Sequence, residues 1–417
     1  MKYKIFSVVF VFSLWLYCGC YNPSKMNFTN ISSNYQNQAR LLNISFCAFN
    51  INQDSTRIYY SLNPAGLLFQ KDVKNEYYFA QFQVKYELFN VKETKKIVDS
   101  ASFIITDSTH YKYEKNIIDS FNVFTRFPSD YILALTITDL NKKYTSTNYL
   151  NILKSSNLGR NSFIVRDKNN SPLMSNCVRS NQQFFIEMNG QQVYKLYVKY
   201  FSREFLPAEP PFTIVSSKSE VLRPDTIFTI DINNEKSNLM TLTKPGIYHF
   251  QADTSKKEGF TLFHFYEDFP LITNAEQMLY PLKYITTKNE FNDLLMMKNI
   301  KSTIDAFWLE KAGNAERARE MIKVYYNRVQ DANRFFTSYT EGWKTDRGII
   351  YVVFGPPYSV YRSPFNETWN YGEDRNIFSM TMDFNKTDNP YTDNDYTLSR
   401  SPEYKDVWYS AVESWRR

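Results

Sequence analysis

Glycine and histidine are scarce in this chain of 417 residues, which contains 11 glycines and three histidines. None of His110, His249 and His264 stands in a nucleophile or metal-ligand motif, and the cysteines form no Cys-x-x-Cys pair. Glycine-rich phosphate loops, dinucleotide-binding fingerprints and the serine-hydrolase elbow are also absent. The sequence therefore contains no pattern that predicts a metal, a cofactor or a nucleotide.

A strong charge of one sign is missing too. The formal net charge is +6, and the lysines and arginines are scattered among acids instead of clustered. Surfaces that bind nucleic acid need clustered basic residues, so we expect no nucleic-acid partner. Aromatic residues, in contrast, are abundant at 17%, with 34 Phe and 32 Tyr. Large planar side chains suit half-buried pleated sheets, which favours a β-rich fold.

Long hydrophobic runs are limited to the N-terminus, where Lys2 and Lys4 precede an apolar run from Ile5 to Leu16. This run is too short to span a bilayer as a helix, but it has the length of a signal-peptide core. No later run approaches spanning length. We therefore expect residues 1–19 to be a signal peptide and the mature chain to be a soluble body.

The residues after this run resemble the cleavage site of a bacterial lipoprotein. Gly19 is small and precedes Cys20, whose thiol would carry a diacylglycerol after cleavage. Cys18 is the poorer candidate because bulky Tyr17 precedes it. The alternative is an ordinary secretory signal with a coincidental cysteine. Several acyl chains hold a protein on a membrane far more firmly than one chain does, so the resemblance implies a membrane-anchored protein.

Acidic residues are missing from Cys20 to Gln53. Lipoproteins of Bacteroidota that reach the cell surface tend to carry acids just after the cysteine, so their absence favours an outer-membrane protein facing the periplasm. Residues 20–40 are rich in asparagine and serine and show little periodicity. This composition is typical of a flexible tether between the lipid and the folded body.

Cys47 and Cys177 are the remaining thiols. In an oxidising envelope they could pair, but each lies in or beside a β-like apolar stretch, where a lone cysteine behaves as a small buried hydrophobe. The domain division below also places them in different units. We therefore expect both thiols to be unpaired.

Alternation of apolar and polar residues dominates the chain after the tether. In residues 81–88 the side chains of Phe82, Val84, Tyr86 and Leu88 face one way, as a strand with one solvated face requires. Residues 131–138 and 144–153 predict two strands joined by a turn. Several such strands predict an immunoglobulin-like β-sandwich over residues 41–156.

A second β-rich stretch covers residues 160–268. Residues 246–266 predict a hairpin with a polar tip, which would hold His249 and His264 as exposed or cross-strand residues. The prolines of residues 207–211 bar that part from a central strand. We expect a second sandwich here, followed by a connector over residues 269–300.

The pattern becomes helical from Asn314, a plausible N-cap, and its apolar residues recur every three or four positions to about Tyr339. The segment GWKTDRGIIYVVFGPP, Gly342 to Pro357, follows. Gly342 and Gly348 suit positive φ, and Trp343 has the area to fill a crevice between helix and sheet. Its continuous apolar run, residues 349–354, predicts a strand buried on both faces.

Polar and terminal residues of the same segment have structural roles in this interpretation. Thr345 and Asp346 can accept bonds from backbone N–H groups in a turn, and Arg347 can pair with Asp346, Glu341 or Glu367. Gly355 bends the chain, while Pro356 and Pro357 stop the predicted strand. Residues 367–372 and 377–384 predict further strands of a small antiparallel sheet, with the long helix on one face.

This segment, together with RVQDANRFF before it and ETWNY after it, closely resembles the GWxTD domain, which is named for Gly342, Trp343, Thr345 and Asp346. The family occurs in envelope proteins of Bacteroidota and some other bacteria, and its biochemical activity is unassigned. The resemblance covers residues 300–417 and implies an α+β domain behind β-rich segments. The expected fold is thus mainly β, with tandem sandwiches followed by a helix-plus-antiparallel-sheet GWxTD domain over residues 301–417.

Three functions are compatible with this organisation. We expect a non-enzymatic envelope lipoprotein that scaffolds or binds protein partners, because the β-modular body contains no catalytic constellation. The first alternative is a glycan- or peptide-processing enzyme whose acids are Asp346 and Glu367, since glycoside hydrolysis needs two carboxyl groups about 5–10 Å apart. The second is a glycan-binding surface lipoprotein that uses exposed Trp and Tyr side chains.

Overall fold

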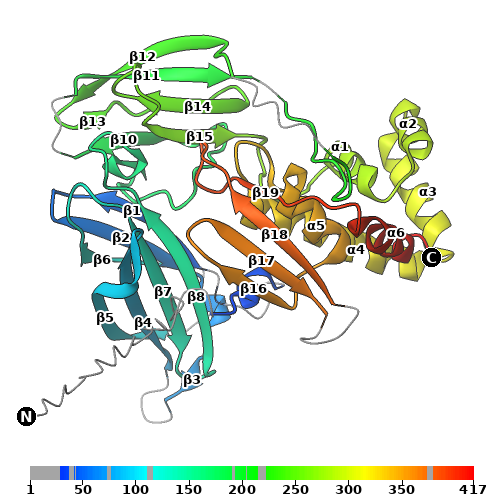
Figure 1. The fold of residues 1–417 in the computed structure, drawn as a ribbon, viewed down its shortest axis with the longest axis horizontal. Coiled ribbons are helices and arrows are strands. Elements are labelled where there is room, and N and C mark those ends of the chain that lie inside the picture. The colour runs from blue at the N-terminus through cyan, green and yellow to red at the C-terminus, as the bar shows by residue number, and fades with distance from the viewer. Residues whose placement is uncertain are drawn as a thin grey trace, which may run out of the picture.

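The structure is a computed structural model that describes residues 29–36, 42, 44–72, 77–109, 116–189, 193–202, 204–214, 222–372 and 379–417. The predicted signal peptide, Cys18, Cys20 and His110 lie outside the described residues. The described part contains four antiparallel sheets and a helical C-terminal part (Figure 1). A mainly β fold with a C-terminal helix-plus-sheet unit is therefore confirmed. No helix within the described ranges has the length and apolarity needed to cross a membrane.

The first β unit consists of two sheets that share one core. One sheet has the order β1-β2-β6, and the other has the order β3-β4-β7-β8 with β5 also paired to β4. The strands are β1 (Ile44–Asn50), β2 (Ser55–Leu62), β3 (Gln70–Lys71), β4 (Tyr78–Asn90), β5 (Glu93–Thr109), β6 (Ile117–Phe124), β7 (Tyr131–Asp139) and β8 (Tyr144–Ile152). Ile58 of β2 and Val84 of β4 lie in the same apolar cluster, and the predicted alternation of residues 82–88 is confirmed.

The second β unit is one seven-stranded sheet whose two ends meet. Its order is β15-β14-β11-β12-β13-β10-β9. The strands are β9 (Phe163–Asp167), β10 (Phe184–Met188), β11 (Lys195–Phe201), β12 (Thr226–Asn233), β13 (Lys236–Ser237), β14 (Gly246–Gln251) and β15 (Phe260–His264). The ring centroids of Phe163 and Phe260, on the two end strands, are 4.7 Å apart. Leu173 N donates to Val165 O of β9 at 2.8 Å and Val178 N to Phe263 O of β15 at 2.9 Å, so one segment links both ends.

The C-terminal unit combines six α-helices with a four-stranded sheet of order β16-β17-β18-β19. The helices are α1 (Ala275–Leu279), α2 (Lys288–Met296), α3 (Ile300–Ala312), α4 (Ala315–Phe336), α5 (Asp346–Phe354) and α6 (Tyr404–Ser414), and the strands are β16 (Ser359–Arg362), β17 (Asn366–Tyr371), β18 (Met380–Lys386) and β19 (Tyr396–Leu398). Short 3₁₀ helices are η2 (Ser32–Tyr35), η4 (Pro64–Gly66), η5 (Arg160–Ser162), η6 (Tyr280–Tyr284) and η7 (Gly342–Lys344).

Helix α4 confirms the helical pattern read from the sequence. Asn314 is its N-cap, and the Asn314 side chain accepts a hydrogen bond from Arg317 N. The helix ends at Phe336, earlier than the expected end near Tyr339. Its buried stripe, which includes Tyr325, Val329 and Phe336, faces the core of the C-terminal unit.

The prediction of a buried strand over residues 349–354 is wrong, because these residues belong to α5. Thr345 caps this helix by accepting a hydrogen bond from Gly348 N, and Asp346 occupies its first turn. Ile349 to Val353 are all buried. A short run that is apolar on every side has the same pattern in a buried strand and in a buried helix, and tertiary packing here overrides the β-propensity of its isoleucines and valines.

Residues 29–36 are packed against the C-terminal unit, although they lie in the stretch expected to be a flexible tether. Ile31 N donates to Val360 O at 2.9 Å, and Val360 N donates to the Asn30 side chain at 3.0 Å, which extends the β16 edge. The Tyr35 ring lies 5.1 Å from Phe336 and 5.5 Å from Trp369, measured between ring centroids. We call residues 29–36 the N-terminal clasp.

The clasp should contribute measurably to stability. Truncating the buried Tyr35 ring leaves a cavity, so Tyr35→Ala is expected to lower the free energy of unfolding by about 3–5 kcal/mol. Tyr280→Ala is the matched control because Tyr280 is 54% exposed. Urea unfolding followed by tryptophan fluorescence compares the two variants. Equal, small losses for both would contradict the packing of the clasp.

Candidate functional site

The GWxTD motif forms a corner between two helices, α4 and α5. After α4 the chain makes the single turn η7, and Thr345 then starts α5. The Thr345 hydroxyl donates to Gly342 O at 2.8 Å and accepts from Gly348 N at 3.1 Å. One threonine side chain therefore closes the turn and caps the helix.

Both glycines of the corner are needed for close backbone approach. A Cβ added to Gly342 would lie 1.9 Å from Ala332 O, and one added to Gly348 would lie 1.8 Å from Gly342 O. Neither glycine has a positive φ, which corrects the reason given from the sequence. Gly355 does have a positive φ of 85° and ends α5, so the predicted bend there is confirmed. Pro356 and Pro357 follow a helix and not the predicted strand.

Trp343 is buried and held by groups from both sides of the corner. Its backbone N–H donates to the Asn333 side chain at 3.2 Å, and its carbonyl accepts from the Tyr284 hydroxyl at 3.3 Å. The Tyr284 and Trp343 ring centroids are 6.0 Å apart in an edge contact. Asn333 also donates to Pro270 O at 3.3 Å. The motif tryptophan thus links α4 to η6, while Asn333 itself links α4 to the segment that joins the second β unit to α1.

Asp346 is bonded to the last residue of β19 and to Arg400, which follows that strand. Leu398 N donates to one carboxylate oxygen at 2.9 Å, and the Arg400 guanidinium forms an ion pair with the other. Burial raises the pKa of the Asp346 carboxyl above its ordinary value, while Arg400 and the Leu398 N–H oppose that rise. The role of Asp346 as an acceptor of a backbone bond is confirmed, but its donor lies in a distant segment instead of the turn.

Glu367 is fully buried and lies at the centre of a network that reaches the surface only through Arg362. Arg347 donates to its Oε2 at 3.2 Å, and Arg362 Nε donates to its Oε1 at 2.6 Å. Trp369 Nε1 and the Tyr35 hydroxyl add hydrogen bonds of 3.2 and 3.1 Å. Burial opposes ionisation of Glu367, but the charges of Arg362 and Arg347 outweigh it and lower the pKa to about 2. The carboxylate is therefore charged at neutral pH.

Two arginines around one carboxylate leave one positive charge in excess, and Arg347 has further partners that stabilise it. Its guanidinium carbon lies 4.0 Å from the centroid of the Tyr396 ring, a favourable cation–π distance. Its Nη2 donates to the Asn394 backbone carbonyl at 2.9 Å and to the Asn394 side chain at 2.5 Å. Of the three acids considered as partners for Arg347, the structure shows Glu367, and the network extends to the loop before β19.

The two acids weighed as a catalytic pair have separate partners. Asp346 is paired with Arg400, whereas Glu367 is paired with Arg347 and Arg362. Glu367 has no exposed surface, and neither acid lines either of the two larger cavities found in the described residues. These carboxylates lie in the interior and not in an open cleft.

The loop of residues 391–395 connects this network to the two β units. Asn394 Nδ2 donates to Phe335 O at 3.1 Å and to Thr337 O at 2.9 Å, which ties the loop to the end of α4. Asp393 forms an ion pair of 3.0 Å with Arg160, in the link between the β units. The Tyr391 ring lies 5.3 Å from the Phe201 ring of the second unit. One short loop therefore contacts all three units.

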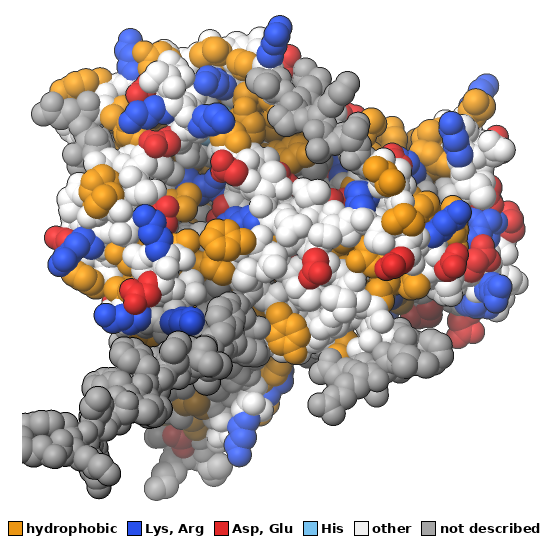
Figure 2. Space-filling model, viewed as in Figure 1, with side chains coloured by type: hydrophobic (Ala, Val, Ile, Leu, Met, Phe, Trp, Pro, Cys, Tyr) orange, Lys and Arg blue, Asp and Glu red, His pale blue; other side chains and the backbone are white. Residues whose placement is uncertain are grey.

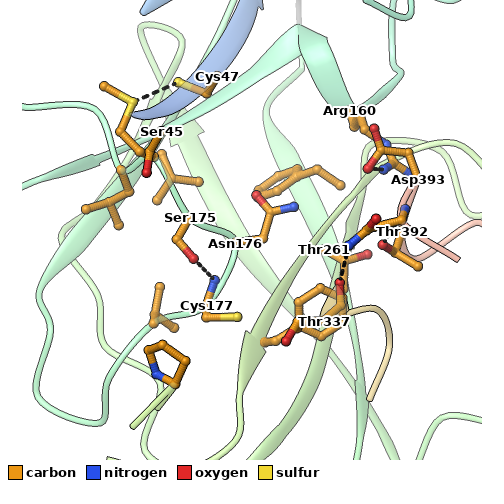
Figure 3. Close-up of a pocket in the computed structure, with 18 of the residues that line it drawn as sticks. Ser45, Cys47, Arg160, Ser175, Asn176, Cys177, Thr261, Thr337, Thr392 and Asp393 are labelled. Atoms are coloured by element: carbon orange, nitrogen blue, oxygen red, sulfur yellow. Dashed lines mark hydrogen bonds and ion pairs between the residues drawn. The ribbon is translucent and has the colours of Figure 1, made fainter. Parts of the chain in front are cut away.

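A cavity of about 1030 Å³ lies where the three units meet, and we call it the junction cavity. Its walls come from strands β1, β8, β9 and β15 and from the loop of residues 391–394. They also include residues 173–178, the segment that links the two ends of the second β unit. Figure 3 shows Ser45 and Cys47 on one side, Ser175 to Cys177 on another, and Arg160 with Asp393 on a third.

Both described cysteines line this cavity as free thiols. Cys47 Sγ lies 3.8 Å from Met174 Sδ, a contact drawn in Figure 3. Burial raises the pKa of each thiol to about 12. The thiolate is the reactive form of cysteine, so neither side chain has the character of a nucleophile.

His249 and His264 are both buried in the predicted hairpin, which corrects the expectation of exposed side chains. His249 Nδ1 is 2.9 Å from the Thr261 hydroxyl, and His264 bonds to Ser180 and to Lys244 O. No cluster of metal-binding residues occurs among the residues that the structure describes. The two histidines make separate structural contacts.

A family model described as GWxTD domain matches residues 246–417, so the expected resemblance is confirmed at the level of this domain. The match begins at β14, well before residue 301, and so includes the last hairpin of the second β unit. No curated protein matches the chain in sequence. Among solved structures, a crystal structure of red sea bream transglutaminase aligns with 55% of this chain at 8% identity and a TM-score of 0.19. The aligned part spans 32% of that transglutaminase, and a likeness this low carries no argument.

The buried ion network predicts a large effect of a neutral substitution. Glu367→Gln leaves two buried arginines without their counter-charge, so the free energy of unfolding at pH 7 should fall by about 3–5 kcal/mol. Glu413→Gln is the control, because Glu413 is 53% exposed and 3.8 Å from Arg416, and it should cost less than about 1 kcal/mol. Chemical denaturation of both variants checks the difference. Similar losses would show that the network adds nothing beyond a surface pair.

His249 predicts a loss of stability in mild acid. Burial, with the nearby charges of Lys199 and Arg160, lowers the pKa of His249 from 6.5 to about 4. Between these two pKa values the unfolded chain binds a proton at His249 and the folded chain does not. The stability that is present above pH 6.5 is therefore lost as the pH falls towards 4. Between about pH 7.5 and pH 5 this costs about 2 kcal/mol. His249→Gln should flatten that part of the stability profile, and an unchanged slope would contradict the assignment.

Proposed function

We propose that this protein is a non-enzymatic, lipid-anchored scaffold of the cell envelope that binds partner proteins. The observation that carries the proposal is that charged residues of the motif hold other segments of the fold in place. Its charged residues Asp346 and Arg347 are both bonded to other segments of the fold, and the loop that Arg347 holds forms one wall of the junction cavity. The GWxTD motif therefore helps to hold one wall of the junction cavity in place.

The enzymatic alternative has less support from the same geometry. A general acid or nucleophile must reach its substrate. Glu367 has no exposed surface and accepts bonds from four side chains, and Asp346 is bonded to Arg400 and to the backbone of Leu398. The arrangement favours structural roles for both carboxylates.

Anchoring through Cys20 would hold the body close to the lipid surface. The clasp is already bound at Thr29 and Asn30, so nine residue steps separate Cys20 from the folded part. A fully extended chain spans at most about 3.6 Å per residue, which limits this link to about 32 Å. The proposed tether is thus much shorter than the expected spacer of residues 20–40. Such a link favours partners that lie at the same membrane surface.

The visible surface also suits protein contacts. In Figure 2, lysines and arginines are interspersed with acids, and hydrophobic side chains lie in small groups over the β units. Strand β12 carries exposed Ile227 and Phe228, which are 54% and 40% exposed. Mixed charge with scattered apolar side chains is typical of surfaces that form specific, modest interfaces.

The proposal predicts both anchoring and partners. Crosslinked co-purification of the wild-type protein from the native envelope should return at least one stoichiometric protein partner, and mass spectrometry should find an acylated Cys20. Cys20→Ser should release the protein into the soluble fraction and reduce partner recovery, because it removes the anchor and leaves the body intact. Wild-type protein that is unacylated and recovers no stoichiometric partner would overturn the proposal.

A further inference from the structure

Strand β1 is an edge strand, and its free edge faces the junction cavity. In the order β1-β2-β6, β1 pairs only with β2. Residues 44–48 of β1 all line the cavity. An edge strand presents unpaired N–H and C=O groups that can pair with another extended chain.

The direction of the β1 backbone groups follows from two side-chain caps. Ala48 O accepts a hydrogen bond from Asn161 Nδ2 at 3.2 Å, and Asn50 O accepts one from Asn189 Nδ2 at 2.7 Å. These carbonyls therefore point away from β2. Because alternate residues of an antiparallel strand point the same way, the N–H and C=O of Phe46 also point away from β2.

Phe46 marks the part of this edge that the fold leaves open. Asn161 and Asn189 supply amide groups where a neighbouring strand would otherwise pair, at Ala48 and Asn50. No backbone group among the described residues bonds to Phe46 on its outer side. The capped carbonyl of Ala48 and the open groups of Phe46 both belong to the cavity lining, so the open part of the edge lies within the cavity.

Apolar residues elsewhere in the cavity lining can contact the side chains of an added strand. Leu173 and Met174 lie on the segment that closes the second β unit, and Phe263, Phe265 and Phe269 lie further along the wall. The five residues of β1 along the cavity span about 17 Å, at about 3.3 Å per residue. This length and the volume of about 1030 Å³ suit a short extended peptide.

We propose that the junction cavity binds an extended peptide segment of a partner protein, which adds as a strand to the β1 edge at Phe46. The inference rests on the proposed scaffold function and names the partner's chemistry at that site. Main-chain bonds to Phe46 supply the pairing, and apolar side chains on alternate positions of the peptide contact the aromatic wall.

Charge along the cavity adds a preference to this recognition. Arg160, Arg179 and Arg334 line it together with Glu267 and Asp393, so the cationic residues outnumber the acids. Arg160 is paired with Asp393 and Arg334 with Asp331, whereas Arg179 has no ion pair with any residue of the described ranges. Glu267 likewise has no ion pair with any residue of these ranges, so a peptide that carries one acidic and one basic residue beside its apolar positions matches this lining.

The test uses a defined probe and two variants at one residue. Peptides selected from a displayed random library on the mature full-length protein are synthesised with a fluorescent label, and their affinities are measured by anisotropy. Phe46→Ala keeps the backbone N–H, whereas Phe46→Pro removes it, and proline is tolerated on a free edge. We expect Phe46→Pro to bind at least tenfold more weakly than Phe46→Ala, and the Phe46 amide of the wild type to gain hydrogen-exchange protection.

A second variant keeps the inference falsifiable if Phe46→Pro fails to fold. Ser175 also lines the cavity (Figure 3), so Ser175→Trp adds bulk there while it leaves the sequence of β1 unchanged, and it should also abolish binding. Failure to select any peptide, or equal affinity for wild type, Phe46→Pro and Ser175→Trp, overturns the inference. Envelope partners retained by Phe46→Pro and Ser175→Trp would overturn this site but not the scaffold. A wild type without partners would overturn the scaffold itself.

Discussion

The buried carboxylate of Glu367 is the constraint on which the C-terminal unit depends. Its oxygens accept hydrogen bonds from Arg347 of α5, from Arg362 of β16 and from Tyr35 of the N-terminal clasp. A buried ion pair contributes little net stability when complete, but the loss of one partner leaves an uncompensated charge in the interior. Three remote parts of the chain are therefore held to one arrangement by the cost of separating them.

The motif residues extend that arrangement outward. Gly342 and Gly348 allow two helices to meet at backbone distance, and Trp343 fills the space beside them. Arg347 also donates to Asn394, which fixes the loop of residues 391–395. Asp393 of the same loop forms an ion pair with Arg160, in the link between the two β units. A corner that resembles a catalytic loop in its composition instead sets the position of a cavity wall. The concave surface and the motif are thus consequences of the same packing.

Much of the β architecture follows from alternation in the sequence, because a strand with one buried face must alternate. Strand β4 around Val84 was predictable in this way. The hairpin of β14 and β15 was predictable from its polar tip, and the cap of α4 from an asparagine before a helical period, although β7, β14 and β15 are buried at most positions. Helix α5 was not predictable, since a run buried on every side has no period that separates helix from strand. Arg347 with Glu367 was one of three candidate pairs. Tyr35 was beyond prediction, because its partners lie more than 300 residues away and its own segment has no periodicity.

The N-terminal clasp has a consequence for how the protein is made. A ribosome releases residues 29–36 long before it has synthesised β16 and β17, which form the socket for Tyr35. Residues 29–36 therefore reach their final place only after β16 and β17 have been synthesised. The closed clasp is a mark of a completed polypeptide, and chains that stop short of Glu367 lack the acceptor that closes it.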